Sequence, residues 1–67
     1  MDRHRVDSSN IISIGWEDGV LEVEFTKGEV YQYEGVPEHL YMDLLHAKSV
    51  GKKFAAEIVG HFEGERV

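Results

Sequence analysis

The chain has 67 residues, enough for one small domain and too few for a second hydrophobic core. It contains no cysteine, which excludes disulfide bonds and thiolate metal sites. Its formal net charge of −6 disfavours sequence-independent binding to nucleic acid, because such binding depends on lysine and arginine side chains releasing counterions from phosphates. No apolar run approaches the roughly 20 residues that span a membrane, so we expect a cytoplasmic protein without membrane contact.

The first predicted element is a β-hairpin that follows a flexible N-terminal arm over residues 1–8. Apolar residues alternate with polar or small ones over residues 12–16 and again over residues 21–25, on either side of the turn signal Asp18-Gly19. A two-residue turn there sets the register Glu17 with Val20, Trp16 with Leu21, Ile14 with Val23 and Ile12 with Phe25. The apolar side chains of both strands then share one face, which supports this register.

A third strand carries the aromatic pair Tyr31 and Tyr33 after a turn at Lys27-Gly28. A two-residue turn would place both tyrosines on the outer face, opposite acidic residues of the second strand. A three-residue turn with Gly28 in the left-handed conformation would place them on the core face. Lysine adopts positive φ poorly and glycine readily, which favours the three-residue turn and buried tyrosines.

After Gly35 the hydrophobic period changes from that of a strand to that of a helix. Pro37 suits the first position of an amphipathic helix of roughly ten residues, and Ser49 can cap a second short helix that ends near Gly60. The predicted fold class is α+β, a three-stranded antiparallel β-meander followed by two short helices packed on one face. The domain is expected over residues 9–60, with a frayed tail over residues 61–67.

The tyrosine pair is the first candidate for a binding site. Two rings at alternate positions of a strand point to the same face, so Tyr31 and Tyr33 suit either a core ladder or a platform on which nucleic-acid bases stack. The sequence leaves both interpretations open, because neither the spacing nor the residue type distinguishes them.

The second candidate is a basic cluster at the start of the second helix. Lys48, Lys52 and Lys53, together with free backbone N–H groups near Gly51, suit a phosphate group, and solvated surface lysines explain the same pattern. Arg3 and Arg5 would add charge if the arm folded over this cluster.

Metal, cofactor and catalytic sites are not expected. His39, Asp43 and His46 share one stripe of the first helix, but a solvated polar stripe explains them equally well. The serines lie in no setting that activates a nucleophile, so we expect a protein that is not an enzyme.

Several short motifs follow one another in a specific order over residues 8–59. They are Ser9-Asn10-Ile11, Ile14-Gly15-Trp16, Leu21-x-Val23-x-Phe25-x-x-Gly28, Tyr31-x-Tyr33-x-Gly35-Val36-Pro37, Tyr41, Leu44-Leu45-x-Ala47-x-Ser49-x-Gly51 and Phe54. This ordered set resembles the KTSC family, which is named for its place at the C-terminus of some lysyl-tRNA synthetases and also occurs as stand-alone proteins in bacteria and phages. The resemblance implies a suggested RNA-binding role and lends importance to Tyr31 and Tyr33, without saying whether they pack or bind.

These observations predict a non-catalytic small binding module. Its partner would be RNA or another single-stranded nucleic acid, bound through Tyr31, Tyr33, Lys48, Lys52 and Lys53. One alternative is a protein-interaction module that forms a homodimer, or docks a host protein, through the edge strand over residues 11–16. The other is a protein that binds a small nucleotide-like anion between the sheet and the second helix.

Overall fold

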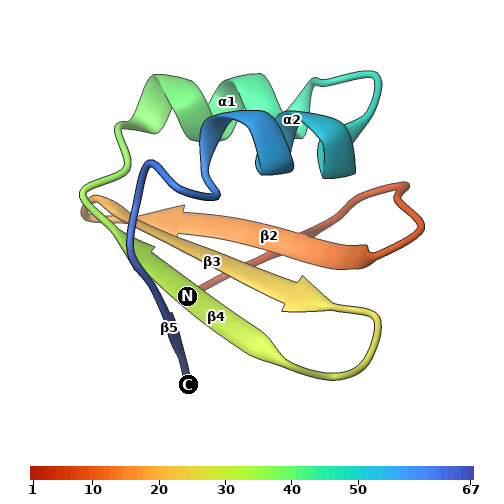
Figure 1. Cartoon of the computed structure of the whole chain (residues 1–67), viewed down its shortest axis with the longest axis horizontal. Helices are drawn as coiled ribbons and strands as arrows, with labels where there is room; N and C mark the ends of the chain where they lie inside the picture. Colours follow the sequence, from red (N-terminus) through yellow and green to blue (C-terminus); the bar gives the residue numbers. More distant parts are fainter.

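The computed structural model describes residues 1–67 and contains one antiparallel sheet with the strand order β1-β2-β3-β4-β5. The strands are β1 (His4–Arg5), β2 (Ile11–Glu17), β3 (Val20–Phe25), β4 (Val30–Glu34) and β5 (Gly64–Arg66), and the helices are α1 (Glu38–Leu45) and α2 (Val50–Glu57). Figure 1 shows both helices on one face of the sheet. The α+β class is confirmed, whereas the prediction of three strands is wrong, because the sheet has five.

The hairpin of β2 and β3 forms around Asp18 and Gly19, which both have positive φ, as the predicted two-residue turn requires. Trp16 lies opposite Leu21, as predicted, and the register continues through the middle of both strands. A β-bulge between Ile11 and Ser13 then places Ile11, not Ile12, opposite Phe25. The predicted pairing of Ile12 is wrong because a bulge adds one residue to one strand.

The turn between β3 and β4 has the predicted three-residue form. Gly28 has a φ of 92° and its N–H donates to the carbonyl of Phe25 over 2.9 Å. Tyr31 consequently lies opposite Val23, and Tyr33 opposite Leu21, on the face that the helices cover. The left-handed glycine thus decides which side of the sheet carries the aromatic pair.

The helices close a single apolar core against the inner face of the sheet. Pro37 is the N-cap of α1 and has an extended backbone, whereas the sequence placed it at the first position inside the helix. Ser49 caps α2 by accepting a hydrogen bond from the Lys52 N–H over 3.3 Å. The fully buried side chains are Ile11, Ile14, Leu21, Val23, Val36, Leu44 and Ile58. Neither helix has the length and apolar character that crossing a membrane requires.

Both ends of the chain add a short strand to the sheet. In β1, His4 pairs with Ile14 and Arg5 with Ser13, and β5 pairs with β4 from Gly64 to Arg66. The prediction that residues 11–16 form an open edge strand is therefore wrong, since β1 pairs with part of that strand. The mobility predicted for the arm over residues 1–8 and the tail over residues 61–67 stays a prediction.

Candidate functional site

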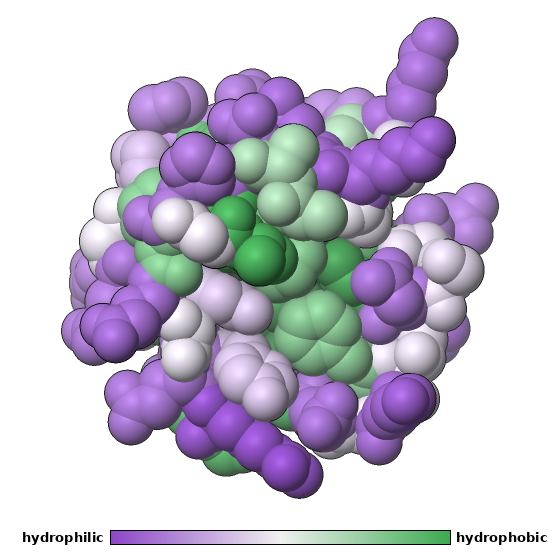
Figure 2. Space-filling view, in the orientation of Figure 1, coloured by the Kyte–Doolittle hydropathy of each residue, from purple (hydrophilic) through white to green (hydrophobic).

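The two tyrosines lie in an aromatic cluster between the sheet and α2. Their rings stack with centroids 6.4 Å apart, Phe54 meets Tyr33 edge-on at 5.5 Å, and Phe25 meets Tyr31 edge-on at 5.8 Å. Tyr33 is 8% exposed and Tyr31 is half-buried. In the space-filling view, apolar and aromatic side chains show between the helices and the sheet, within a hydrophilic surround (Figure 2).

Tyr33 packs into the core of the domain. Burial, and to a smaller extent the neighbouring Tyr31, raises the pKa of the Tyr33 phenol above its ordinary value. A side chain built on Gly64 would collide with the same ring, so β5 also closes on it. Tyr33 is thus a core residue and the half-buried Tyr31 packs against the core, while a base-stacking role for the pair stays a prediction.

Two of the predicted lysines line one hollow at the start of α2, which we call the α2 groove. Its volume is about 580 Å³, and it lies between the loop that leads into β2 and the first turns of α2. Its lining residues are Asp7, Ser8, Ser9, Asn10, Lys48, Ser49, Val50, Gly51, Lys52 and Ala55. Lys53 is half-buried and does not line the groove, so the predicted basic cluster is only partly assembled there.

The wall of the α2 groove opposite the helix is a loop held by its own side chains. The Ser8 hydroxyl donates to Oδ1 of Asn10 over 2.9 Å and accepts the N–H groups of Asn10 and Ile11, each over 3.3 Å. A Cβ on Gly51 would lie 2.8 Å from Asn10 Oδ1, closer than side-chain contacts allow. A side chain at residue 51 would therefore require the Asn10 side chain to shift, and glycine lets the loop and α2 pack together without that shift.

The electrostatics of the groove combine one acidic and several positive contributions. The N-terminus of α2 carries a partial positive charge, which adds to the charges of Lys48 and Lys52. No acidic residue in the first turn of α2 offsets it. Asp7 on the opposite wall works against an anion. Arg3 and Arg5 do not line the groove, so the expected contribution of the arm is absent there.

Sequence reasoning identified the lysines but missed the loop wall of residues 7–10. The signal that could have found it is Gly51, because a glycine inside the first turn of a helix costs stability unless another segment packs closely there. The Ser9-Asn10-Ile11 motif, separated from Gly51 along the chain, meets it only after folding.

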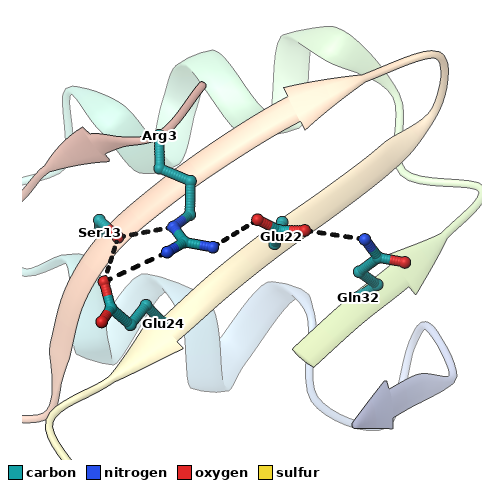
Figure 3. A network of polar contacts seen from close by, with 5 residues as sticks. All are labelled: Arg3, Ser13, Glu22, Glu24 and Gln32. Atoms are coloured by element: carbon teal, nitrogen blue, oxygen red, sulfur yellow. Dashed lines mark hydrogen bonds and ion pairs between the residues drawn. The ribbon is translucent and has the colours of Figure 1, made fainter. Parts of the chain in front are cut away.

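A second polar feature covers the outer face of the sheet, on the side away from the helices (Figure 3). The Arg3 guanidinium donates to the carboxylate of Glu22 and, over 3.5 Å, to that of Glu24, while Arg3 Nε donates to Ser13 Oγ over 3.0 Å. The Ser13 hydroxyl in turn donates to Glu24 over 2.9 Å. This network ties the N-terminal segment to β2 and β3.

The Glu22 carboxylate links that network to β4. Gln32 donates a hydrogen bond to it from β4 over 2.8 Å. That bond lowers the pKa of Glu22 below its ordinary value; burial opposes the shift, and the hydrogen bond and charge of Arg3 reinforce it. The carboxylate is therefore held in its ionised form.

The structure brings together no group of three or more metal-ligating side chains. His39, Asp43 and His46 lie exposed on and just after α1. The α2 groove is accordingly the best candidate site for a ligand among the residues singled out in the sequence.

The fold and the site together define a small α+β domain with a polar groove at the capped start of a helix. The KTSC domain model matches residues 7–62, and the chain belongs to the KTSC domain family. It is 43% identical over 56 residues to an uncharacterized protein of Stutzerimonas stutzeri strain A1501, a match that covers 81% of this chain and 79% of the relative.

The same family assignment follows from a solved structure. The crystal structure of a KTSC domain protein from Yersinia pestis superposes with a TM-score of 0.91 at 39% identity, covering 98% of this chain and 96% of that one. The coverage includes nearly the whole chain, so the similarity extends to the terminal strands as well as to the central hairpins. The resemblance drawn from the sequence is thereby confirmed.

Proposed function

We propose that the protein is a non-catalytic binding module that holds single-stranded RNA by its phosphates in the α2 groove. The observation that carries the proposal is that Lys48 and Lys52 line one open hollow together with the N-terminus of α2. Lysine ammonium groups and free backbone N–H groups at a helix N-terminus are the donors that phosphates prefer. The site of action we propose is the cytoplasm.

Charge is distributed in a way that supports this choice of surface. The outer face of the sheet carries Glu22, Glu24, Glu34 and Glu65 and would repel a phosphate backbone. The α2 groove lies between the helix layer and the β1–β2 loop, where lysines face a single acidic residue. RNA would therefore approach from the helix side, and Tyr31 and Tyr33 are not part of this proposal.

The test is binding of a fluorescein-labelled oligouridine, measured by fluorescence anisotropy over a range of salt concentrations. We expect Lys48→Ala and Lys52→Ala each to weaken binding and to reduce the slope of log K against log salt by about 0.7, the value for one phosphate contact on a single strand. Lys27→Ala is the matched control, because Lys27 is an exposed lysine outside the groove.

Two results would overturn the proposal. One is the absence of RNA binding at low ionic strength, where every phosphate contact is strongest. The other is binding that Lys27→Ala weakens as much as Lys52→Ala does, because the interaction would then follow net charge and not the groove.

A small nucleotide-like anion is the second candidate ligand, because a hollow of about 580 Å³ has the size of small-molecule sites. Uridine monophosphate is the probe that separates the two ligands. If it stabilises the protein against heat and competes with the oligouridine at equal phosphate concentration, the groove recognises a nucleotide and not a strand.

A further inference from the structure

The outer face of the sheet contains a guanidinium site that is already filled. Arg3 reaches it from the N-terminal segment and contacts two carboxylates and one hydroxyl, as Figure 3 shows. Ser13, which accepts Arg3 Nε, is 5% exposed, so part of this site is buried beneath the guanidinium. Three acceptors around one planar cation form a specific recognition site for arginine. A lysine ammonium lacks the planar set of donors that contacts all three acceptors.

The backbone at this site is shaped to receive an extended strand. His4 and Arg5 pair with β2, and the Val6 N–H donates to the carbonyl of Ile12 over 3.0 Å. A side chain at Gly15 would collide with the carbonyl oxygen of Asp2, so the absence of a side chain lets the strand cross there. The edge of β2 therefore supplies backbone pairing next to the arginine site, the two elements of strand addition.

The segment that fills the site is weakly attached. β1 has only two residues, and both are exposed. Beyond the Arg3 network, Val6 is the residue of the segment that packs against the core, and it does so while half-buried. Short strands with few buried side chains open at low free-energy cost compared with global unfolding.

We propose that the edge of β2, together with Ser13, Glu22 and Glu24, is a docking site for an extended arginine-bearing segment of a partner protein. Residues 2–6 of this chain occupy the site in cis and must leave before the partner binds. Charge complementarity selects this partner, because the face around the site is acidic and Arg3 is the cation paired with Glu22 and Glu24. This surface is separate from the α2 groove.

The probe is a fluorescein-labelled peptide with the sequence of residues 1–7, because the structure shows that this sequence fits the site. It is titrated against the full-length protein and against Arg3→Ala, which keeps the strand but vacates the guanidinium site. We expect the peptide to bind Arg3→Ala about tenfold more tightly than the unsubstituted protein, since the competing cis arginine is gone. The same peptide with alanine in place of its third residue should lose that gain.

Three further variants make the test specific. Arg5→Ala is the matched control, because Arg5 lies in the same N-terminal segment, is exposed and makes no ion pair, so the peptide should bind it as it binds the unsubstituted protein. Arg3→Lys keeps the charge without the planar fork and should give intermediate affinity. Adding Glu22→Gln to Arg3→Ala should abolish the gain. Amide NMR spectra establish that each variant is folded and show whether the peptide shifts the Ile14 and Gly15 signals.

Equal binding of the arginine and alanine peptides would overturn the proposal, as would a lack of binding to folded Arg3→Ala or Arg3→Lys at a peptide concentration of about 1 mM. Sedimentation adds a third result. A concentration-dependent dimer of the unsubstituted protein that Arg3→Ala abolishes would mean that the segment of a second copy fills the site, which replaces the foreign partner with self-association.

Discussion

The two faces of the sheet are built from alternate residues of the same strands, yet different forces hold them. On the inner face Ile14, Leu21 and Val23 are fully buried beneath the helices. On the outer face Ser13, Glu22 and Glu24 hold an arginine from the chain's own N-terminal segment. The inner face gains from removing apolar surface from water, which is large and non-directional. The outer face gains from charge-assisted hydrogen bonds, which are directional and modest in net free energy.

The difference separates stability from recognition. A buried apolar side chain makes many small contacts that no single neighbour dominates, and its loss leaves a cavity. A guanidinium among three acceptors can be exchanged for another guanidinium with little change in free energy. We therefore expect the inner face to decide whether the domain folds and the outer face to decide what lies along β2.

The largest expected effect comes from the inner face. Leu21→Ala should lower the free energy of unfolding by about 2–5 kcal/mol, because it removes a fully buried side chain. Chemical denaturation followed by circular dichroism measures the change. Its neighbour Val20 points to the outer face and is half-buried, so Val20→Ala should cost less than about 1 kcal/mol. Similar losses for both variants would remove the distinction between the faces.

Gly15 is the outer-face residue with the largest expected cost. Gly15→Ala places a Cβ against the Asp2 carbonyl and 3.0 Å from Arg3 Cγ, and we expect a loss of about 1–3 kcal/mol as β1 shifts. Adding Arg3→Ala should then cost almost nothing more, because the strand has already moved. Additive losses in this double-mutant cycle would show that Gly15 and the segment are independent.

Removing the guanidinium alone should have a smaller effect. Arg3→Ala is expected to lower the free energy of unfolding by about 1 kcal/mol, since its ion pairs are partly exposed. Hydrogen exchange should show faster exchange at the Val6 N–H, which donates to Ile12, with no change at the amides of β3. Faster exchange throughout the sheet would instead place the network in the global stability of the domain.

The smallest effect is the pH dependence of Glu22. Its pKa is lowered from 4.5 in the folded state, first by the hydrogen bond from Gln32. The ionised form thus favours the folded state; this stabilisation is present above the unfolded pKa and is lost as the pH falls through the lower, folded value. The midpoint temperatures of the unsubstituted protein and Glu22→Gln should converge on acidification from about pH 6 to about pH 3.

Gln32→Leu checks the cause of that pH dependence. Because it removes the largest contribution to the lowered pKa, the stability of this variant should fall less steeply with acid than that of the unsubstituted protein. If acidification lowered the midpoint temperatures of the unsubstituted protein, Glu22→Gln and Gln32→Leu by the same amount, Glu22 would not be the source of the pH dependence.

The central fold was predictable because its signals are local. Asp18-Gly19 indicated the first turn, Gly28 the second, and Ser49 the cap of α2, each through a backbone conformation or hydrogen bond that a few neighbouring residues decide. The lysines of the α2 groove were identified for the same reason, since they lie near one helix start. Ile12 was misplaced because a bulge leaves no comparable signature in the alternation.

By itself the sequence determined the two hairpin turns, the helix cap and the side of the sheet that becomes apolar, because period and turn chemistry act over a few residues. The tertiary structure alone decided that β1 and β5 complete the sheet, that Asn10 meets Gly51, and that Arg3 reaches Glu22. These contacts join residues far apart in the chain. Their free energy depends on which surfaces the folded hairpins bring within reach, and no local pattern records that.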